Sequence, residues 1–372
     1  MILDDPRQPT LERILDLAIR IQQVPAPTFK ERRRALFVRD LLAAEGLQDI
    51  AMDRQGNVYA RLPGRRSEYP IIVSAHLDTV FAGKSMMPAS RQAGRICGPG
   101  IGDNSLGVAA LLGLAWLLRE TPEPLESDVW LVANTCEEGL GDLRGMKAVV
   151  DRFGDRVRGY LVLEGTALGQ VYHRAVGVQR YRVTINTPGG HSWTDYGRPS
   201  AVHELAALIT GLTGLPLPAR PRTTMNVGTI RGGTGINVLA SQAQFDLDLR
   251  SESADVLAQL CSEVQGRMQD RRRNGVDIQL ESIGQRPAGQ IPADHPLVQL
   301  AVECLAQEGV EPSLTSGSTD ANIPLSRGIP AVVLGITTGT GAHTEQECID
   351  LAPAPHGMSQ LVNFVRRLSK LE

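Results

Sequence analysis

Ile71-Ile-Val-Ser-Ala-His76-Leu-Asp78-Thr-Val80 is the stretch that indicates the fold. Its apolar, β-branched beginning is typical of a buried strand in a parallel sheet. His76 and Asp78 follow where the strand ends, on the same side of an extended chain. Sites in open α/β sheets are built at such strand ends. A single histidine at a strand end is more often structural. The residues that follow the other predicted strands therefore determine how His76 is interpreted.

Length and composition describe a globular protein with more than one domain. The chain has 372 residues, which is more than one ordinary core holds, so two domains are expected. A hydrophobic content of 42% and a charged content of 21% are typical of a soluble protein. The net charge of −3 and the lack of a long basic tract predict no nucleic-acid partner. No apolar run approaches membrane-spanning length, so no membrane association is expected.

The cysteines favour a reducing compartment. Five are present, an odd number, widely spaced and without a Cys-x-x-Cys pair. This pattern predicts reduced thiols rather than a disulfide framework. The N-terminal residues show no apolar segment of the signal-peptide kind, so a cytoplasmic location is expected. The cysteines are Cys97, Cys136, Cys261, Cys304 and Cys348.

Carboxylates follow two further predicted strands, and another lies in a glycine-rich loop. Glu137 and Glu138 come after the apolar strand 128–133, and Glu164 comes directly after the strand 159–163. Asp103 lies in the loop 98–107, ahead of an apolar helix. Adjacent carboxylates beside a buried strand are unfavourable unless they bind a cation or a proton. Each residue alone has an ordinary structural explanation, but their shared placement predicts one site.

The same loop also invites a nucleotide-binding interpretation, and with it a dinucleotide-dependent oxidoreductase. Asp103 occupies the third glycine position of Gly-x-Gly-x-x-Gly, and no Gly-Lys-Ser/Thr follows, so neither nucleotide-binding motif is complete. A metal site explains the pattern better. One histidine with several carboxylates is a ligand set for a pair of divalent cations bridged by a carboxylate. His343, which follows the strand 331–335 and a Gly/Thr loop, supplies the expected second imidazole.

At this point the chain resembles a known family: the co-catalytic zinc peptidases that include carboxypeptidase G, succinyl-diaminopimelate desuccinylase, aminoacylase and peptidase T. The resemblance spans nearly the whole chain, and the motifs occur in the family's order. The matching motifs are His76-Leu-Asp78-Thr-Val, Gly102-Asp103-Asn, Glu137-Glu138-Gly, Glu164-Gly165 and Gly341-Ala-His343.

The resemblance implies a role for each of these residues. Asp103 would bridge two metal ions, and the peptide bond from Asp103 to Asn104 would be cis. One metal would be held by His76 and Glu164, and the other by Glu138 and His343. Glu137 would be the general base, and Asp78 would steady His76. We expect two divalent metal ions per chain, zinc first, with cobalt or manganese as alternatives.

The order of predicted strands and helices changes in the middle of the chain. Strands and helices follow there in the order β-α-β-β-α-β, which is the pattern of a ferredoxin-like α+β domain. We therefore predict a discontinuous α/β catalytic domain, residues 1–174 and 287–372, with a mixed, mostly parallel sheet flanked by helices. The inserted domain, residues 175–286, would by resemblance be the lid and the dimerisation domain, which predicts a homodimer.

The resemblance also implies residues outside the metal centre. His191, in Pro-Gly-Gly-His-Ser-Trp, would reach a neighbouring subunit's site as an oxyanion donor, although a plain loop histidine is the alternative. Asn237 and Arg250 would grip a substrate carboxylate, whereas Arg250 could equally be a structural partner of Asp246 or Asp248. The stretch Ser316-Gly317-Ser-Thr319-Asp320-Ala-Asn resembles the substrate loop of peptidase T, which makes Gly317, Thr319 and Asp320 candidate substrate contacts.

These patterns predict a metal-dependent hydrolase that cleaves an amide bond in small peptides or N-acyl amino acids. The 316–322 loop favours a peptidase T-like aminopeptidase. A carboxypeptidase G-like exopeptidase, an aminoacylase or a desuccinylase remains open because all of them need the same metal centre. A non-catalytic binding protein is the remote alternative, since it would be expected to lack the base or a ligand.

Overall fold

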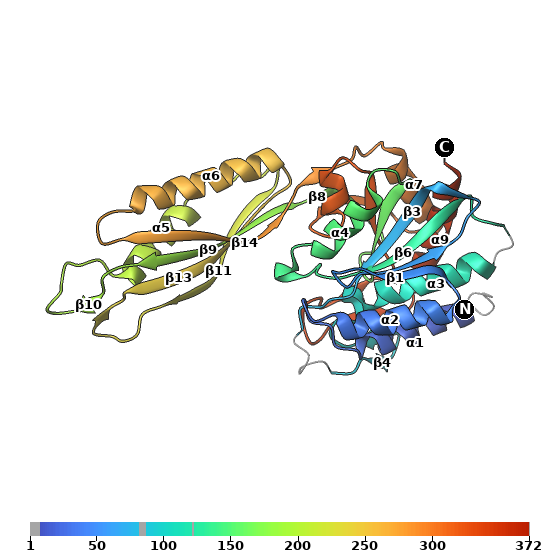
Figure 1. Cartoon of the computed structure of the whole chain (residues 1–372), viewed down its shortest axis with the longest axis horizontal. Coiled ribbons are helices and arrows are strands. Elements are labelled where there is room, and N and C mark those ends of the chain that lie inside the picture. The colour runs from blue at the N-terminus through green and yellow to red at the C-terminus, as the bar shows by residue number, and fades with distance from the viewer. Residues whose placement is uncertain (1–7, 82–86, 121–122, 372) are drawn as a thin grey trace. The chain divides into compact units, whose positions relative to one another are not determined.

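The computed structural model describes residues 8–81, 87–120 and 123–371. The chain divides into two compact units, Met1–Ala175 with Gln290–Glu372, and Val176–Gly289. We call them the main unit and the inserted unit. Each has its own cluster of buried apolar side chains, as expected for domains that fold around separate cores. Figure 1 shows both units.

A nine-stranded mixed sheet forms the centre of the main unit, in the order β1-β2-β6-β3-β7-β17-β8-β15 with β16 beside β8. The four central strands β6, β3, β7 and β17 are parallel to one another. This arrangement confirms the predicted α/β architecture. The strands are β1 (Gln48–Met52), β2 (Val58–Leu62), β3 (Arg66–His76), β6 (Ser127–Asn134), β7 (Gly159–Glu164), β8 (Gln170–Ala175), β15 (Gly289–Gln290), β16 (Ser313–Gly317) and β17 (Ala331–Gly335).

The central strands are parallel and buried because their sequences are nearly continuous apolar runs. Strand β3 is buried from Pro70 to His76, and β17 is buried over its whole length. The register aligns their carboxyl ends: His76 pairs with Asn134 on β6, and Glu164 at the end of β7 pairs with Gly335 on β17. Side chains that follow these strands are therefore delivered to one edge of the sheet.

Helices cover this sheet. Helix α3 packs against β3, β6 and β7 and also contacts α1 and α9. It is buried from Leu106 to Leu118. The stretch Ile101–Glu120 is long and apolar enough to cross a membrane, but 94% of its apolar window is buried, as in a core helix. The helices of this unit are α1 (Gln8–Gln22), α2 (Arg32–Ala44), α3 (Leu106–Glu120), α4 (Arg144–Phe153), α7 (Pro296–Gln307), α8 (Asn322–Ser326) and α9 (Ala354–Lys370).

A second, four-stranded sheet of short strands joins two distant parts of the main unit. Its order is β18-β19-β5-β4, and its neighbours are antiparallel. The strands are β4 (Ser90–Gln92), β5 (Arg95–Cys97), β18 (Gly339–Thr340) and β19 (Cys348–Asp350). The loop after β5 leads to Asp103, and the loop between β18 and β19 carries His343, so this sheet links two segments that the sequence separates widely.

The inserted unit is a four-stranded antiparallel sheet in the order β11-β13-β9-β14, on which α5 and α6 pack (Figure 1). With β9 first and β14 last in the chain, this confirms the predicted ferredoxin-like β-α-β-β-α-β order. A two-stranded ribbon of β10 and β12 is added to it. The elements are β9 (Gly177–Asn186), β10 (Gly190–His191), α5 (Ala201–Thr213), β11 (Thr223–Gly232), β12 (Val238–Leu239), β13 (Gln242–Ser251), α6 (Ala254–Arg271) and β14 (Asp277–Arg286).

One cysteine prediction is wrong. Cys97 and Cys348 form a disulfide, whereas Cys136, Cys261 and Cys304 are free thiols. The two bonded residues face each other in the register of β5 and β19, although 251 positions separate them in sequence. Spacing along the chain could not predict this pairing, because it arises from the contact of two strands that have no local relation.

Breaking this bond should destabilise the main unit. A disulfide that closes a long loop restricts the unfolded chain, and its removal typically costs about 2–5 kcal/mol. The Cys97→Ser/Cys348→Ser protein should therefore unfold at lower temperature and lower urea concentration than the oxidised wild type, and wild type treated with a phosphine reductant should match it. Cys261→Ser, which removes a free thiol, is the control. Equal stability of oxidised and reduced wild type would contradict this expectation.

Candidate metal centre and active site

All five sequence-predicted metal ligands come together at the carboxyl edge of the central strands. His76 ends β3, Glu164 ends β7, and Glu138 follows β6 after a short turn. Asp103 lies in the turn Ile101–Ser105, just before α3, and His343 lies in the loop between β18 and β19. The register of the parallel strands brings His76, Glu164 and Glu138 to one edge of the sheet. The small four-stranded sheet brings the loops of Asp103 and His343 to the same place.

Asp103 lies between the two imidazoles. Its Oδ1 is 3.0 Å from Nε2 of His76, and its Oδ2 is 3.0 Å from Nε2 of His343. The peptide bond from Asp103 to Asn104 is cis, and both residues leave helical backbone angles within the turn. One carboxylate thus presents one oxygen to each histidine, which is the geometry that a bridging ligand requires.

The side chains group into two ligand sets around this aspartate. His76, Asp103 and Glu164 form one, and Asp103, Glu138 and His343 form the other. Within each set, the ligand atoms all lie within 4.8 Å of one another. Glu137 joins His76 and Glu138 in a third group at the same range, so the expected general base lies beside the expected ligands.

The donor set fits divalent metal ions. Two imidazole nitrogens and several carboxylate oxygens suit zinc and its neighbours in the first transition row. Oε1 of Glu138 is buried and lies 3.3 Å from Nε2 of His343. A buried carboxylate is unfavourable unless positive charge or hydrogen bonds compensate for its burial.

The carboxylates of the centre shift the pKa values of its two histidines. Burial lowers the pKa of His76, but hydrogen bonding to Asp103, Asp78 and Glu164 more than offsets it and raises that pKa well above its usual value. Hydrogen bonding to Asp103 and Glu138 raises the pKa of His343 to about 10. Burial raises the pKa of Glu164. Positive charge is therefore strongly favoured here, either as protons or as metal ions.

Asp78 contacts His76 and also holds the turn that follows β6. Nδ1 of His76 lies 3.0 Å from the main-chain oxygen of Asp78 and 3.7 Å from its carboxylate. The carboxylate also accepts hydrogen bonds from the backbone N–H groups of Glu137 and Glu138, at 2.9 Å each. Asp78 thus lies against the imidazole of His76 and fixes the turn that carries Glu137 and Glu138.

Two buried polar side chains that the sequence analysis did not identify hold the loops of the centre. Asn104 donates to the oxygen of Leu163 and accepts from the backbone N–H groups of Gly107 and Gly165, which ties the Asp103 turn to the end of β7. Arg34 donates to the carbonyl of Leu77, directly after His76. The Asp-Asn pair inside the loop could have drawn attention to Asn104, but nothing local identifies Arg34.

A third overlooked residue is Glu347, four positions after His343. It is buried, and its carboxylate accepts hydrogen bonds from the backbone of the Asp103 loop. Burial and the nearby charge of Asp103 raise the pKa of Glu347 to about 7. Its position in an exposed-looking stretch, Thr344-Glu-Gln-Glu347, gives no sign of this role in the sequence.

Three candidate residues lie in the inserted unit. His191 is exposed on β10, where its Nδ1 accepts from the backbone N–H of Trp193. Asn237 is exposed, and its carbonyl accepts from Ser192. Arg250 forms an ion pair with Asp248 at 2.7 Å, as the structural alternative for this residue suggested, while 43% of its side chain stays exposed.

The loop that resembles a substrate loop divides into two parts. Gly317 lies at the end of β16 over the ring of Tyr172, and Thr319 receives a hydrogen bond on its hydroxyl from Ala321. Asp320, in contrast, is fully buried and accepts from the side-chain amide of Asn134 at 2.6 Å. Burial raises the pKa of Asp320 to about 7. Asp320 therefore supports the end of β6 through Asn134.

Comparison with known proteins identifies the family of the chain. The model of peptidase family M20/M25/M40 matches residues 72–367. The chain belongs to this family. Membership places it among the peptidases and amidohydrolases, and the matched range contains every metal-ligand candidate described above.

Individual relatives are distant in sequence, but those described next match most of the chain. A succinyl-diaminopimelate desuccinylase of Corynebacterium glutamicum is 23% identical over 89% of this chain and 90% of its own length. The aminopeptidase PepT of Bacillus cereus shares the fold with a TM-score of 0.80 at 22% identity, over 97% of this chain and 99% of that one. A dinuclear metal-binding peptidase of the M20 family from Bacillus subtilis, YXEP, gives a TM-score of 0.70 at 16% identity, over 97% and 98%.

Metal binding should release protons. Hydrogen bonding to carboxylates raises the pKa of His76 and raises that of His343 to about 10, which favours protonated imidazoles, whereas a metal ion binds neutral imidazole. Calorimetric zinc titrations at pH 7.5 in buffers of different ionisation enthalpy should therefore give a measurable count of protons released per chain, and zinc affinity should rise with pH. His203→Ala, which changes an exposed histidine on α5, should leave the count unchanged. Release near zero at pH 7.5 would contradict this assignment.

Proposed function

We propose that the chain is a two-metal amidohydrolase that acts on small peptides, with an aminopeptidase of the peptidase T kind as its specific activity. The observation that carries the proposal is Asp103, whose two oxygens each face one imidazole, with Glu138 and Glu164 completing the two ligand sets. When bound, two divalent cations would lower the pKa of a water and polarise an amide carbonyl. Zinc is the expected metal, with cobalt or manganese as alternatives.

Glu137 is the proposed general base. It lies in the turn after β6, its backbone N–H donates to the carboxylate of Asp78, and its side chain lies in the group with His76 and Glu138. In amide hydrolysis Glu137 would take a proton from the attacking water and later give it to the leaving amine. Glu137 and Glu138 are adjacent, but the roles proposed for them differ. The same conservative substitution, glutamate to glutamine, made at each position in turn can therefore distinguish the two roles.

Glu137→Gln should retain metal and lose turnover, because glutamine keeps the shape of the side chain but cannot accept the proton. A loss of about 100-fold or more in kcat is expected. Glu138→Gln should instead lower the metal content toward one ion per chain, since it removes a charged ligand. Metal analysis beside kcat measures both effects. If Glu137→Gln were the variant that lost metal, the two assignments would have to be exchanged.

The substrate class is tested by a panel of tripeptides, dipeptides and N-acyl amino acids, each measured with zinc, cobalt and manganese. Tripeptides with a free amino terminus should give the highest kcat/KM, and chelation should abolish turnover until metal is returned. The desuccinylase among the relatives favours a second candidate, cleavage of N-succinyl or other N-acyl amino acids. Higher kcat/KM on those substrates would select it. A chain loaded with two metals that cleaves no amide would be a binding protein.

The proposal also includes Arg250, whose guanidinium would bind a carboxylate of the substrate. Its guanidinium is partly exposed and already paired with Asp248, so its contribution has to be separated from a structural one. Arg250→Ala should lower kcat/KM for peptide acids far more than for the matching C-terminal amides, because a guanidinium–carboxylate pair is specific for charge and geometry. Asn237, Gly317 and Thr319 remain candidate substrate contacts on the same grounds.

The proposal includes a homodimer formed by the inserted unit. Strands β11 and β14 are both edges of its sheet, and exposed edges are usually covered or paired. Apolar side chains lie exposed around the β10–β12 ribbon: Trp193 is 85% and Tyr196 is 90% accessible. A two-fold pairing of such a unit gives a closed dimer. His191, on this ribbon, would then act as an oxyanion donor in the partner's site.

Subunit mixing tests this arrangement. His191→Ala and Glu137→Gln should each be inactive alone, but exchange between the two homodimers should restore activity. In every mixed dimer one site combines an intact Glu137 with an intact His191 of the partner, so random pairing restores about a quarter of all sites. His203→Ala in place of His191→Ala should need no rescue. Proven exchange without recovery would mean that His191 does not act across the dimer.

A cytoplasmic location is also part of the proposal, and the disulfide provides its test. Reducing compartments keep most protein thiols reduced, apart from transient or regulatory bonds. Alkylation of protein in freshly lysed cells, followed by mass analysis of Cys97 and Cys348, reports their state in the cell. Free thiols at both positions would support the cytoplasm, whereas a complete disulfide would favour an oxidising compartment.

A further inference from the structure

Glu347 is a buried carboxylate next to the metal ligands that no ligand set includes. It is 1% exposed and lies in the segment that leads from His343 into β19. Burying a charge away from water is unfavourable unless hydrogen bonds compensate for it. The partners of Glu347 therefore indicate what its burial achieves.

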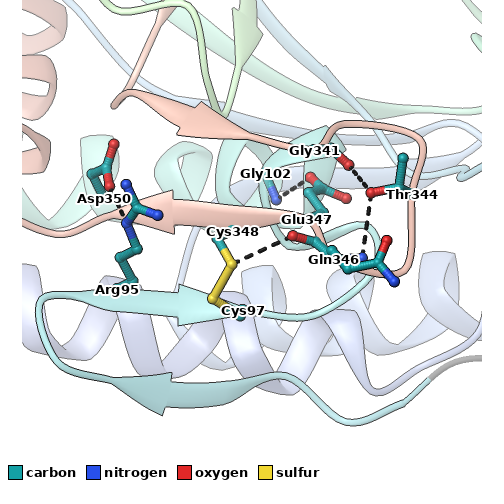
Figure 2. Close-up of a disulfide and its surroundings, with 9 residues drawn as sticks. All are labelled: Arg95, Cys97, Gly102, Gly341, Thr344, Gln346, Glu347, Cys348 and Asp350. Atoms are coloured by element: carbon teal, nitrogen blue, oxygen red, sulfur yellow. Dashed lines mark hydrogen bonds and ion pairs between the residues drawn. A yellow bond between two sulfur atoms is a disulfide. The ribbon is translucent and has the colours of Figure 1, made fainter.

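All three partners are backbone N–H groups of the loop that presents Asp103. Oε2 accepts from Gly100 at 2.5 Å, and Oε1 accepts from Gly102 at 2.8 Å and from Asp103 itself at 2.7 Å. Figure 2 shows the carboxylate of Glu347 pointing at Gly102. Hydrogen bonds from N–H groups to a carboxylate are among the stronger ones in proteins. One side chain thus fixes the main chain on the N-terminal side of the bridging aspartate.

The loop has the residues that this close approach needs. A Cβ on Gly102 would lie 2.9 Å from Oε1 of Glu347 and 2.8 Å from a methyl carbon of Thr166. Gly100 has φ +76°, a conformation that L side chains rarely adopt. The glycines of the loop, which in sequence suggest a nucleotide site, serve instead to bring three N–H groups onto one carboxylate.

The segment that carries Glu347 is itself fastened to the Asp103 loop. The backbone N–H of Gly98 donates to the carbonyl of Glu347 at 2.8 Å, and the disulfide joins the flanking residues Cys97 and Cys348 (Figure 2). The hairpin of His343 and the loop of Asp103 are therefore held together by a covalent bond, a main-chain hydrogen bond and the carboxylate of Glu347.

We propose that Glu347 is a positioning residue for the metal centre. Its carboxylate sets the backbone orientation of Asp103, so that the aspartate can present one oxygen toward His76 and the other toward His343. Glu347 itself touches no metal and no substrate. This inference rests on the proposed two-metal centre and adds a residue to it whose effect is exerted through the Asp103 loop.

The test compares metal binding in two matched variants. Glu347→Gln keeps the size of the side chain but removes its charge and turns an amide N–H₂ toward the donors. Zinc affinity, measured by competition with a chromophoric chelator, should fall roughly 10–100-fold, the range found for residues that orient metal ligands. Glu345→Gln changes an exposed carboxylate two residues earlier on the same loop and should bind zinc like the wild type.

Further measurements separate positioning from general damage. Glu347→Gln should lower kcat more than it raises KM, and Glu347→Asp, which keeps the charge on a shorter side chain, should recover part of the zinc affinity. If Glu347→Gln does not fold, Gly102→Ala disturbs the same contact from the donor side and should show the same loss. A folded Glu347→Gln protein that binds two zinc ions with wild-type affinity would overturn the inference. A wild-type chain that binds no divalent metal would instead overturn the proposed function.

Discussion

The structure depends on one carboxylate that has to face two histidines at once. Asp103 meets His76 and His343 at 3.0 Å each, and these three residues come from a strand end, a loop before a helix and a hairpin near the C-terminus. Positive charge is needed because Glu137, Glu138 and Glu164 surround the same point. The long-range contacts of the main unit bring these segments together, and the carboxylates would repel one another if no proton or metal ion were present.

Much of this arrangement could be predicted from the sequence because parallel strands have a strong local signal. The apolar runs before His76, Glu137 and Glu164 indicate buried strands, and such strands end at a common edge. The alternation and helical periodicity of the inserted unit similarly predict its element order. The apolar runs and the periodicity are both properties of short stretches of sequence. They can therefore be recognised without knowing which segments contact one another in the fold.

The residues that sequence reasoning missed act between distant segments. Glu347 binds a loop more than 240 positions earlier, and Cys348 bonds to Cys97 across 251 positions. Asp320 shows a related difficulty, since a Ser/Gly-rich loop does not indicate whether its carboxylate faces inward. Arg250 has a nearer partner, because Asp248 lies two residues away on the same side of β13. Directions of side chains and contacts between segments are set by tertiary packing, which has no local period.

The division of the chain into two units has a consequence for how its chemistry can vary. Every metal-ligand candidate, the proposed base Glu137 and the supporting residues Asp78, Asn104 and Glu347 belong to the main unit, which has its own core. His191, Asn237 and Arg250 belong to the inserted unit, with a separate core. Substitutions in the inserted unit therefore need not disturb the packing that holds Asp103, because that packing belongs to a separate core.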